Sequence, residues 1–167
     1  MDQKPDWADL LVTYQNGPVQ LREAVEGLSQ KELGLSIDDD NWTIREIIHH
    51  IVEGDDLFIP FIKQALGGLG GKYHLDWYFE QSQIEWGKCW GFDRRNIKPA
   101  LALFRANREH TTSILEGVKE PGKYKLNITW PDGTNIDYGI DGIIQIQVNH
   151  LKEHLEDIQN ILLMYQA

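Results

Sequence analysis

Residues 140–162 read IDGIIQIQVNHLKEHLEDIQNIL, and this stretch decides which kind of fold we expect. Its apolar residues recur three or four positions apart, which places them on one face of an α-helix and leaves the opposite face to solvent. The apolar face consists of Ile140, Ile144, Val148, Leu151, Leu155, Ile158 and Leu162. We therefore predict a long amphipathic helix that starts after Asp141 and runs close to the C-terminus.

Two histidines, His150 and His154, lie on the flank of the buried half of this helix. Because they are four residues apart, their rings project from the same side, one turn and ~6 Å from each other. Two imidazoles at that spacing can hold one metal ion. The same pair can also be hydrogen-bonded core residues, and only a third ligand from elsewhere in the chain separates the two alternatives.

Three earlier segments have the same helical spacing, and they span about residues 7–28, 43–66 and 99–115. The first contains Asn16, Gly17 and Pro18, so we expect a kink or a break there. The second begins with Thr43 and Glu46, which are spaced as a capping box. The chain thus predicts an all-α fold, a four-helix bundle formed by one domain of residues 1–167.

Two segments between the helices are not helical in pattern. In residues 123–140, KYKLNITWPDGTNIDYGI, β-formers flank Pro131, Asp132 and Gly133, which predicts a short β-hairpin before the last helix. Residues 72–95 are rich in aromatic residues and have mixed periodicity, so we expect part helix and part loop. Their rings could form a lid over a site, line a wall for an apolar substrate, or fill a core edge.

The second helix offers two adjacent candidates for a third ligand, His49 and His50, which point ~100° apart. His50 falls on the apolar side with Ile47 and Ile51, whereas His49 falls on the polar side with Glu53. We therefore predict that His50 is the third ligand and that His49 is a solvated surface residue.

The run NWTIREIIHHIVEGD at residues 41–55 resembles the signature of the DinB-like superfamily, which includes YfiT-type metal-dependent hydrolases and bacterial thiol S-transferases. The resemblance extends to LREAVEGLSQKELG at residues 21–34 and to WPDGTNIDYGIDGIIQIQVNHLKEHLEDI at residues 130–158. It covers the first and last thirds of the chain well and the middle poorly. It implies an up-down-down-up order of the four helices.

In that superfamily one histidine of the second helix and two of the last helix hold a metal, which corresponds to His50, His150 and His154 here. The resemblance and the analysis of helix faces select the same residues. We expect one divalent transition metal, zinc on general grounds or nickel because the resemblance admits it.

Three imidazoles leave a coordination position open for water or substrate, which is typical of catalytic rather than structural sites. The expected function is a metal-dependent hydrolase or a transferase that uses a low-molecular-weight thiol, acting on a small molecule. The alternative is a metal-containing ligand-binding or stress-response protein without efficient catalysis. A general base or a group that orients a ligand should lie nearby. We select Glu53 and Asp157 from the polar residues on or beside the inward faces, which also include Asp55, Gln147 and Tyr14.

The overall composition narrows the partners and the compartment. A net charge of −10 disfavours nucleic acids and anionic membranes. Cys89 is the single cysteine, so no intrachain disulfide forms, and no apolar run is long enough for a signal peptide or a membrane span. We expect a cytoplasmic protein, and a homodimer is compatible with its composition.

Overall fold

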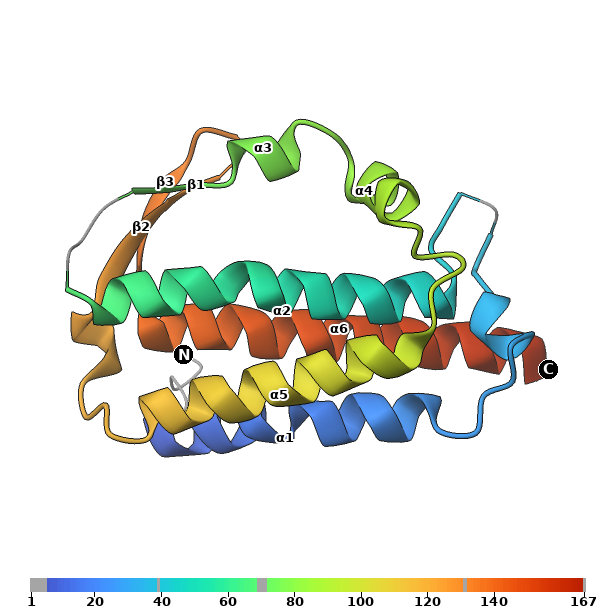
Figure 1. Cartoon of the computed structure of the whole chain (residues 1–167), viewed down its shortest axis with the longest axis horizontal. Coiled ribbons are helices and arrows are strands. Elements are labelled where there is room, and N and C mark those ends of the chain that lie inside the picture. Colours follow the sequence, from blue (N-terminus) through green and yellow to red (C-terminus); the bar gives the residue numbers. More distant parts are fainter. Residues whose placement is uncertain (1–5, 39, 69–71, 131, 167) are drawn as a thin grey trace.

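A computed structural model of the chain describes residues 6–38, 40–68, 72–130 and 132–166. Four long helices form a bundle: α1 (Trp7–Val25), α2 (Ile44–Leu66), α5 (Ile97–Leu115) and α6 (Ile140–Gln166). In Figure 1 the colours along each ribbon show that α1 and α6 run in one direction, whereas α2 and α5 run in the other. The predicted four-helix bundle with up-down-down-up order is confirmed.

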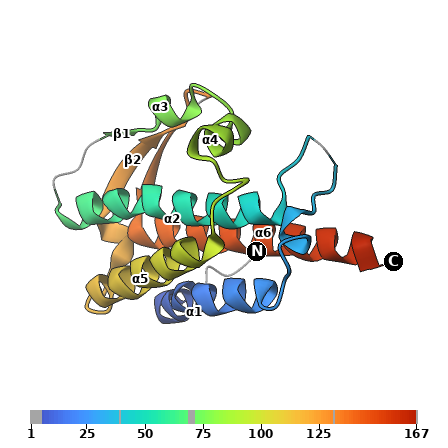
Figure 2. The ribbon, with the colours of Figure 1, turned by 45° about the vertical axis from the view of Figure 1, so that its right-hand side comes forward.

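Each of the four helices packs against two others. Helix α2 contacts α5 and α6, and α1 contacts the same two helices. Because α2 and α5 are parallel, the chain must cross the length of the bundle between them. This crossover carries strand β1 (Lys72–His74) and two short helices, α3 (Asp76–Phe79) and α4 (Gln83–Trp90). It forms a second layer over α2 (Figures 1 and 2).

Side-chain caps explain where two of the long helices begin. At α2 the Thr43 hydroxyl accepts a hydrogen bond from the Glu46 amide at 3.3 Å, and the Glu46 carboxylate accepts one from the Thr43 amide at 2.8 Å. The predicted capping box is therefore present. Helix α5 begins at Ile97, before the expected start at residue 99, because the side chain of Asn96 caps it by accepting from the Lys98 amide.

The predicted hairpin is confirmed as strands β2 (Lys125–Thr129) and β3 (Asn135–Gly139), which pair antiparallel. Pro131 of the predicted turn lies outside the described residues. Strand β1 was not predicted; it pairs parallel to β2, so the sheet order is β1-β2-β3. Its three residues are too few for a period-2 pattern to show. Two short 3₁₀ helices complete the structure, η1 (Glu32–Gly34) and η2 (Pro121–Lys123).

Helix α1 runs through Pro18 without the predicted break. Proline has no amide hydrogen, so the carbonyl of Tyr14, four residues earlier, loses its donor within the helix. Nη1 of Arg108 on α5 donates to that carbonyl instead, at 2.9 Å. A Cβ atom at Gly17 would collide with the same guanidinium. The Asn-Gly-Pro sequence therefore marks the place where the Arg108 guanidinium contacts the backbone of α1.

The apolar core is divided into two clusters along the bundle. One cluster contains Phe61 and Ile144, and the other contains Ile48 and Phe104. Three of the long helices also carry a buried polar residue away from their ends: Asp55 on α2, Arg108 on α5 and Gln147 on α6. Within the described part of the chain, no helix is both long and apolar enough to cross a membrane.

Candidate metal centre

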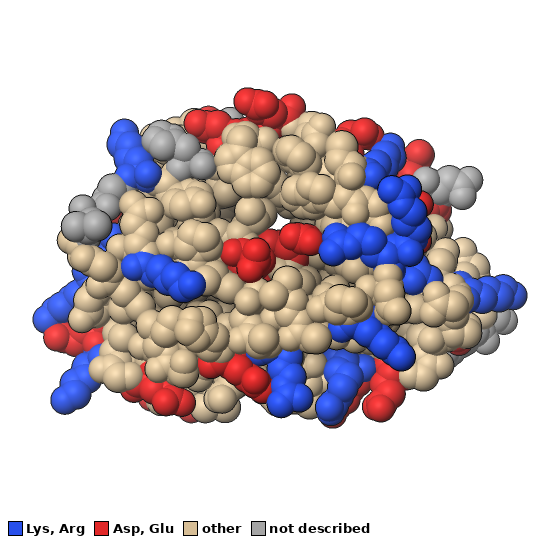
Figure 3. Space-filling model, in the orientation of Figure 1, with Lys and Arg blue, Asp and Glu red and all other residues tan. Residues whose placement is uncertain are grey.

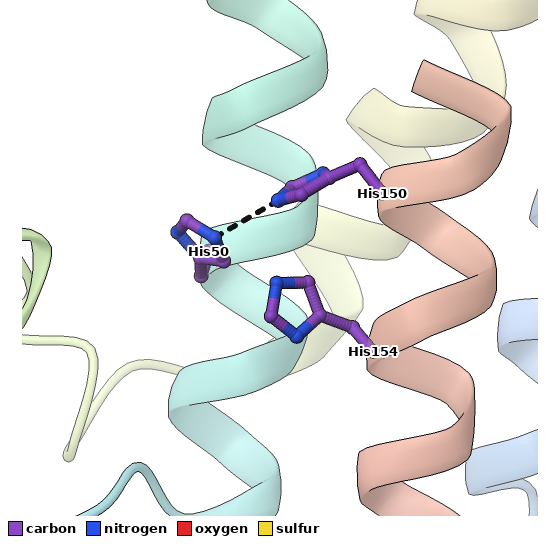
Figure 4. A group of neighbouring side chains, drawn as sticks. All are labelled: His50, His150 and His154. Carbon is purple, nitrogen blue, oxygen red and sulfur yellow. Dashed lines mark hydrogen bonds between the residues drawn. The ribbon is translucent and has the colours of Figure 1, made fainter. Parts of the chain in front are cut away.

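Three histidine side chains converge between α2 and α6. His50 extends from α2, and His150 and His154 extend from neighbouring turns of α6 (Figure 4). Each offers a ring nitrogen, and these three atoms all lie within 4.8 Å of one another. The Nε2 atoms of His50 and His150 are 2.9 Å apart. The sequence-based pairing of His50 with the two histidines of the last helix thus agrees with the geometry.

The spacing of these nitrogens fits one small metal ion. Around a four-coordinate ion with metal–nitrogen bonds of ~2.1 Å, ligand nitrogens are about 3.4 Å apart. The observed separations, from 2.9 Å to at most 4.8 Å, bracket that value.

Two of the three rings are held in the neutral form that binds metals. Burial lowers the pKa of His50 to about 2, and the neighbouring His150 and His154 lower it further in the same direction. Burial also lowers the pKa of His150 to about 3, with smaller contributions from His154 and Arg108. At pH 7 both rings are therefore unprotonated, as metal binding requires.

The lowered pKa values predict that the metal-free protein is sensitive to mild acid. The unfolded chain takes up protons as the pH falls below 6.5, whereas the folded chain does not protonate His50 or His150 until near pH 3. The stability that depends on neutral His50 and His150 is therefore fully present above pH 6.5 and decreases as the pH falls below 6.5. Between pH 7.5 and 5.5 we expect a loss of about 3 kcal/mol, roughly 1.4 kcal/mol for each of the two rings. Urea unfolding of chelated protein measures it; His50→Leu should reduce the loss, and His110→Leu should not.

The surroundings of the triad orient its rings. The Asp157 carboxylate lies 2.9 Å from Nδ1 of His154, so Nδ1–H donates to it and Nε2 is left free for a metal. The ring of Trp42 packs against His50 with centroids 4.2 Å apart. Gly54 allows His150 to approach α2, because a Cβ there would lie 2.9 Å from Cε1 of His150.

Glu53, the other candidate catalytic group, is one helical turn from His50. Its carboxylate lies 3.5 Å from Nη1 of Arg95. Burial raises the pKa of Glu53, and burial together with the charge of Glu53 raises the pKa of Tyr78. A carboxylate with a raised pKa is a better proton acceptor near neutral pH. The catalytic roles of Glu53 and Asp157 remain predictions.

His49 was predicted to be solvated, and this is wrong: the residue is 1% exposed. Its ring stacks on Phe92, with centroids 5.3 Å apart, and Nε2 lies 3.4 Å from the carbonyl oxygen of Arg95. The crossover layer covers this side of α2, which the pattern of α2 alone could not reveal. Burial lowers the pKa of His49. The ring contacts the crossover, whereas His50 contacts the other two histidines.

Arg108 was missed by the sequence analysis, although it joins all four helices of the bundle. From α5 its guanidinium donates to Oδ1 of Asp55 on α2, to the carbonyl of Tyr14 on α1 and to the carbonyl of Gln147 on α6. Gln147 also donates from Nε2 to the carbonyl of Asp55. Asp55 directly follows Gly54, and Gln147 lies about one turn before His150, so these bonds fix the separation of α2 and α6 beside the triad. The only signal in the sequence was the Asn-Gly-Pro interruption in the first helix.

A cavity of about 170 Å³ adjoins the triad. His50 and His150 form part of its lining, together with aromatic residues of α3 and the amide of Gln147. Of the roles considered for residues 72–95, Tyr78 and Phe79 therefore form a wall of the cavity, whereas Trp86 and Trp90 pack at the edge of the core.

Comparisons with known proteins give relatives along most of the chain. The family model of the DinB superfamily matches residues 14–158. Over 160 residues the chain is 31% identical to the Bacillus subtilis (strain 168) protein named "Putative metal-dependent hydrolase YfiT". This match covers 96% of this chain and 84% of the relative. Over 144 residues it is 25% identical to a Geobacillus thermodenitrificans (strain NG80-2) protein named "Putative metal-dependent hydrolase". This second match covers 86% of this chain and 77% of the relative.

A solved structure shows the same architecture. It carries the description "YfiT from Bacillus subtilis is a probable metal-dependent hydrolase with an unusual four-helix bundle topology". The superposition has a TM-score of 0.80 at 17% identity and covers 96% of this chain and 90% of that chain. At this identity the likeness shows the fold.

Proposed function

This chain belongs to the DinB superfamily, and from that premise we propose that it is a metal-dependent hydrolase of a small molecule, with one divalent ion held by His50, His150 and His154. One observation carries the proposal: three ring nitrogens from two helices lie within 4.8 Å of one another beside a cavity. The two relatives named as metal-dependent hydrolases support the reaction class. Imidazole ligands suit zinc and nickel, which are the ions we propose.

The residues of the chain supply the remaining parts of a hydrolytic site. A divalent ion on three imidazoles would provide a Lewis acid that polarises a carbonyl and acidifies water. Asp157 accepts the Nδ1 proton of His154 and so fixes the tautomer that leaves Nε2 free. Glu53, which precedes the cavity-lining Gly54 in the sequence and has a raised pKa, would accept a proton. The cavity holds the organic part of the substrate.

The test is turnover by the metal-loaded protein with simple esters and amides, with and without a low-molecular-weight thiol. We expect hydrolysis that disappears with a chelator and returns with zinc or nickel. Activity that requires the thiol would replace hydrolysis with thiol transfer, the second chemistry expected from the sequence. Metal binding without turnover in either assay would favour the ligand-binding alternative. Full activity in the metal-free protein would contradict all three.

Asp157 should act by positioning His154 rather than by touching the substrate. We expect Asp157→Ala to lower metal affinity by about tenfold, the lower end of the usual effect of such partners, because the Asp157 side chain is 47% exposed. A metal titration measures the change, and exposed Asp93 gives the matched control, Asp93→Ala. Unchanged affinity in Asp157→Ala would show that His154 does not depend on this hydrogen bond.

A further inference from the structure

The cavity beside the triad has a size and lining that select a ligand. We propose that it binds an uncharged apolar group of about the size of one benzene ring, and that the substrate carries this group next to the bond that reacts. The reaction part of this inference rests on the proposed function, whereas the binding part stands on the cavity itself.

The cavity opens directly onto the candidate metal centre. Its lining includes the rings of His50 and His150 and the backbone at Gly54. The Nε2 atoms of those two rings are 2.9 Å apart and belong to the group of three convergent nitrogens. A group that fills the cavity therefore touches two of the three candidate ligands, and the atom bonded to it would lie beside the triad.

The rest of the lining is apolar or neutral. The walls are formed by apolar and aromatic side chains of three helices: Leu57 and Phe58 of α2, Tyr78 and Phe79 of α3, and Ile146 of α6. The neutral amide of Gln147 is a polar group among them. Among the described lining residues there is no Asp, Glu, Lys or Arg. In Figure 3 a hollow between α2 and the crossover has uncharged side chains above it and at its sides, and acidic side chains along its lower rim. Away from the triad an ionic group would lose its hydration without gaining a partner, so the part of the occupant that fills the cavity is uncharged.

The volume sets the size of the occupant. The cavity measures about 170 Å³, and an apolar protein cavity of about 150 Å³ is known to hold benzene. One six-membered ring, or a branched aliphatic group of the same bulk, fills this space. Two fused rings would have to fill nearly the whole of this volume at the packing density of a protein interior, so we expect the cavity to discriminate by size.

The aromatic wall is ordered before any ligand binds. Nε1 of Trp86 donates to the carbonyl of Tyr78 at 2.7 Å, and the two rings are stacked, with an interplanar angle of 10°. Trp90 stacks on Trp86, with centroids 5.0 Å apart, and contacts Phe92. Phe92 stacks on the buried ring of His49 of α2. This series of rings anchors the wall to the bundle, and a preformed cavity binds its ligand at a lower cost in entropy.

The test measures binding by fluorine NMR on the full-length, metal-loaded chain, with fluorobenzene as the probe. Leu57→Trp places an indole where the ligand would lie, and Ile146→Phe fills the same space from α6. Leu103→Trp is the matched control, because Leu103 is 42% exposed on α5 and does not line the cavity. A thermal melt of each variant confirms that it is folded.

We expect saturable binding of fluorobenzene to the parent chain and to Leu103→Trp, and at least tenfold weaker binding to the two cavity-filling variants. 1-Fluoronaphthalene and 4-fluorobenzylammonium should bind at least tenfold more weakly than fluorobenzene. The inference is overturned by equal binding of either compound, or by unchanged binding of fluorobenzene in folded Leu57→Trp. Hydrolysis of p-nitrophenyl acetate without fluorobenzene binding would remove this inference alone, and fluorobenzene binding without any turnover would remove the proposed function alone.

Discussion

Replacing Arg108 with methionine is expected to lower the free energy of unfolding by about 3 to 5 kcal/mol, the usual cost of removing one partner from a buried ion pair. Arg108 is 1% exposed, and its partner Asp55 is 2% exposed. The guanidinium donates to Oδ1 of Asp55 at 3.2 Å from Nε and at 2.9 Å from Nη2. Burial raises the pKa of Asp55, and Arg108 opposes that rise. Without Arg108 the carboxylate must stay charged and unpaired or take up a proton.

The loss has a second source in the backbone. Arg108 also donates to the carbonyls of Tyr14 and Gln147, and the Tyr14 carbonyl has no intrahelical donor because Pro18 follows four residues later. A buried carbonyl left without a donor costs a further ~1–3 kcal/mol unless water reaches it.

Chemical denaturation of Arg108→Met and of Arg105→Met measures this difference. Arg105 is the matched control because its side chain is 70% exposed and forms an ion pair with Glu109 on the surface. We expect Arg105→Met to change stability by less than ~1 kcal/mol. The double variant Arg108→Met with Asp55→Leu should recover part of the loss, since it removes the unpaired charge. A loss below ~1 kcal/mol in Arg108→Met would mean that the pair does not hold the bundle together.

The second large effect concerns metal affinity. Structural zinc sites with four ligands bind with ~10–16 kcal/mol, so each ligand accounts for about 3–4 kcal/mol, or roughly a hundredfold to a thousandfold in affinity. We expect a loss of this size for His50→Ala, His150→Ala and His154→Ala. Keeping His50 and His150 neutral below pH 6.5 costs folding free energy, so the alanine variant of either residue should lose zinc but should lose less stability than the parent in mild acid.

Thermal melts report the same loss by a different route. Metal that binds only the folded chain stabilises it by about 2.7 kcal/mol at a hundredfold excess over the dissociation constant. For a domain of this length the melting temperature should rise by about 5 to 10 °C. His154→Ala should remove this rise, and His110→Ala, on the exposed face of α5, should keep it. A rise of equal size in both variants would locate the stabilising ion elsewhere.

The long helices and the triad could be predicted because both depend on local periodicity. The apolar spacing around His150 and His154 gave their direction, and the neighbours Ile47 and Ile51 distinguished His50 from His49. What that reasoning lacked was the crossover: it could not show that Phe92 and Arg95 cover His49, because a helix face that is polar in one segment can be buried by another.

Other features depend on contacts between residues far apart in sequence. Pro18 predicts a kink or a break when α1 is considered alone; the helix continues through it, and Arg108, 90 positions later, supplies the donor that the Tyr14 carbonyl lacks. Strand β1 is three residues long, and its pairing with β2 defines it more than its own composition does. The cavity likewise exists only when α3, α6 and α2 are placed together.

The central claim is that His50, His150 and His154 together hold one divalent ion. Elemental analysis of untagged protein, equilibrated with zinc at pH 7.5 and freed of excess metal, tests it most directly. We predict about one ion per chain in the parent protein, in His49→Ala and in His110→Ala, and less than about a tenth of an ion in each of the three triad variants, given the affinity loss of roughly a hundredfold or more. Equal metal content in the parent and in all three triad variants would contradict the claim.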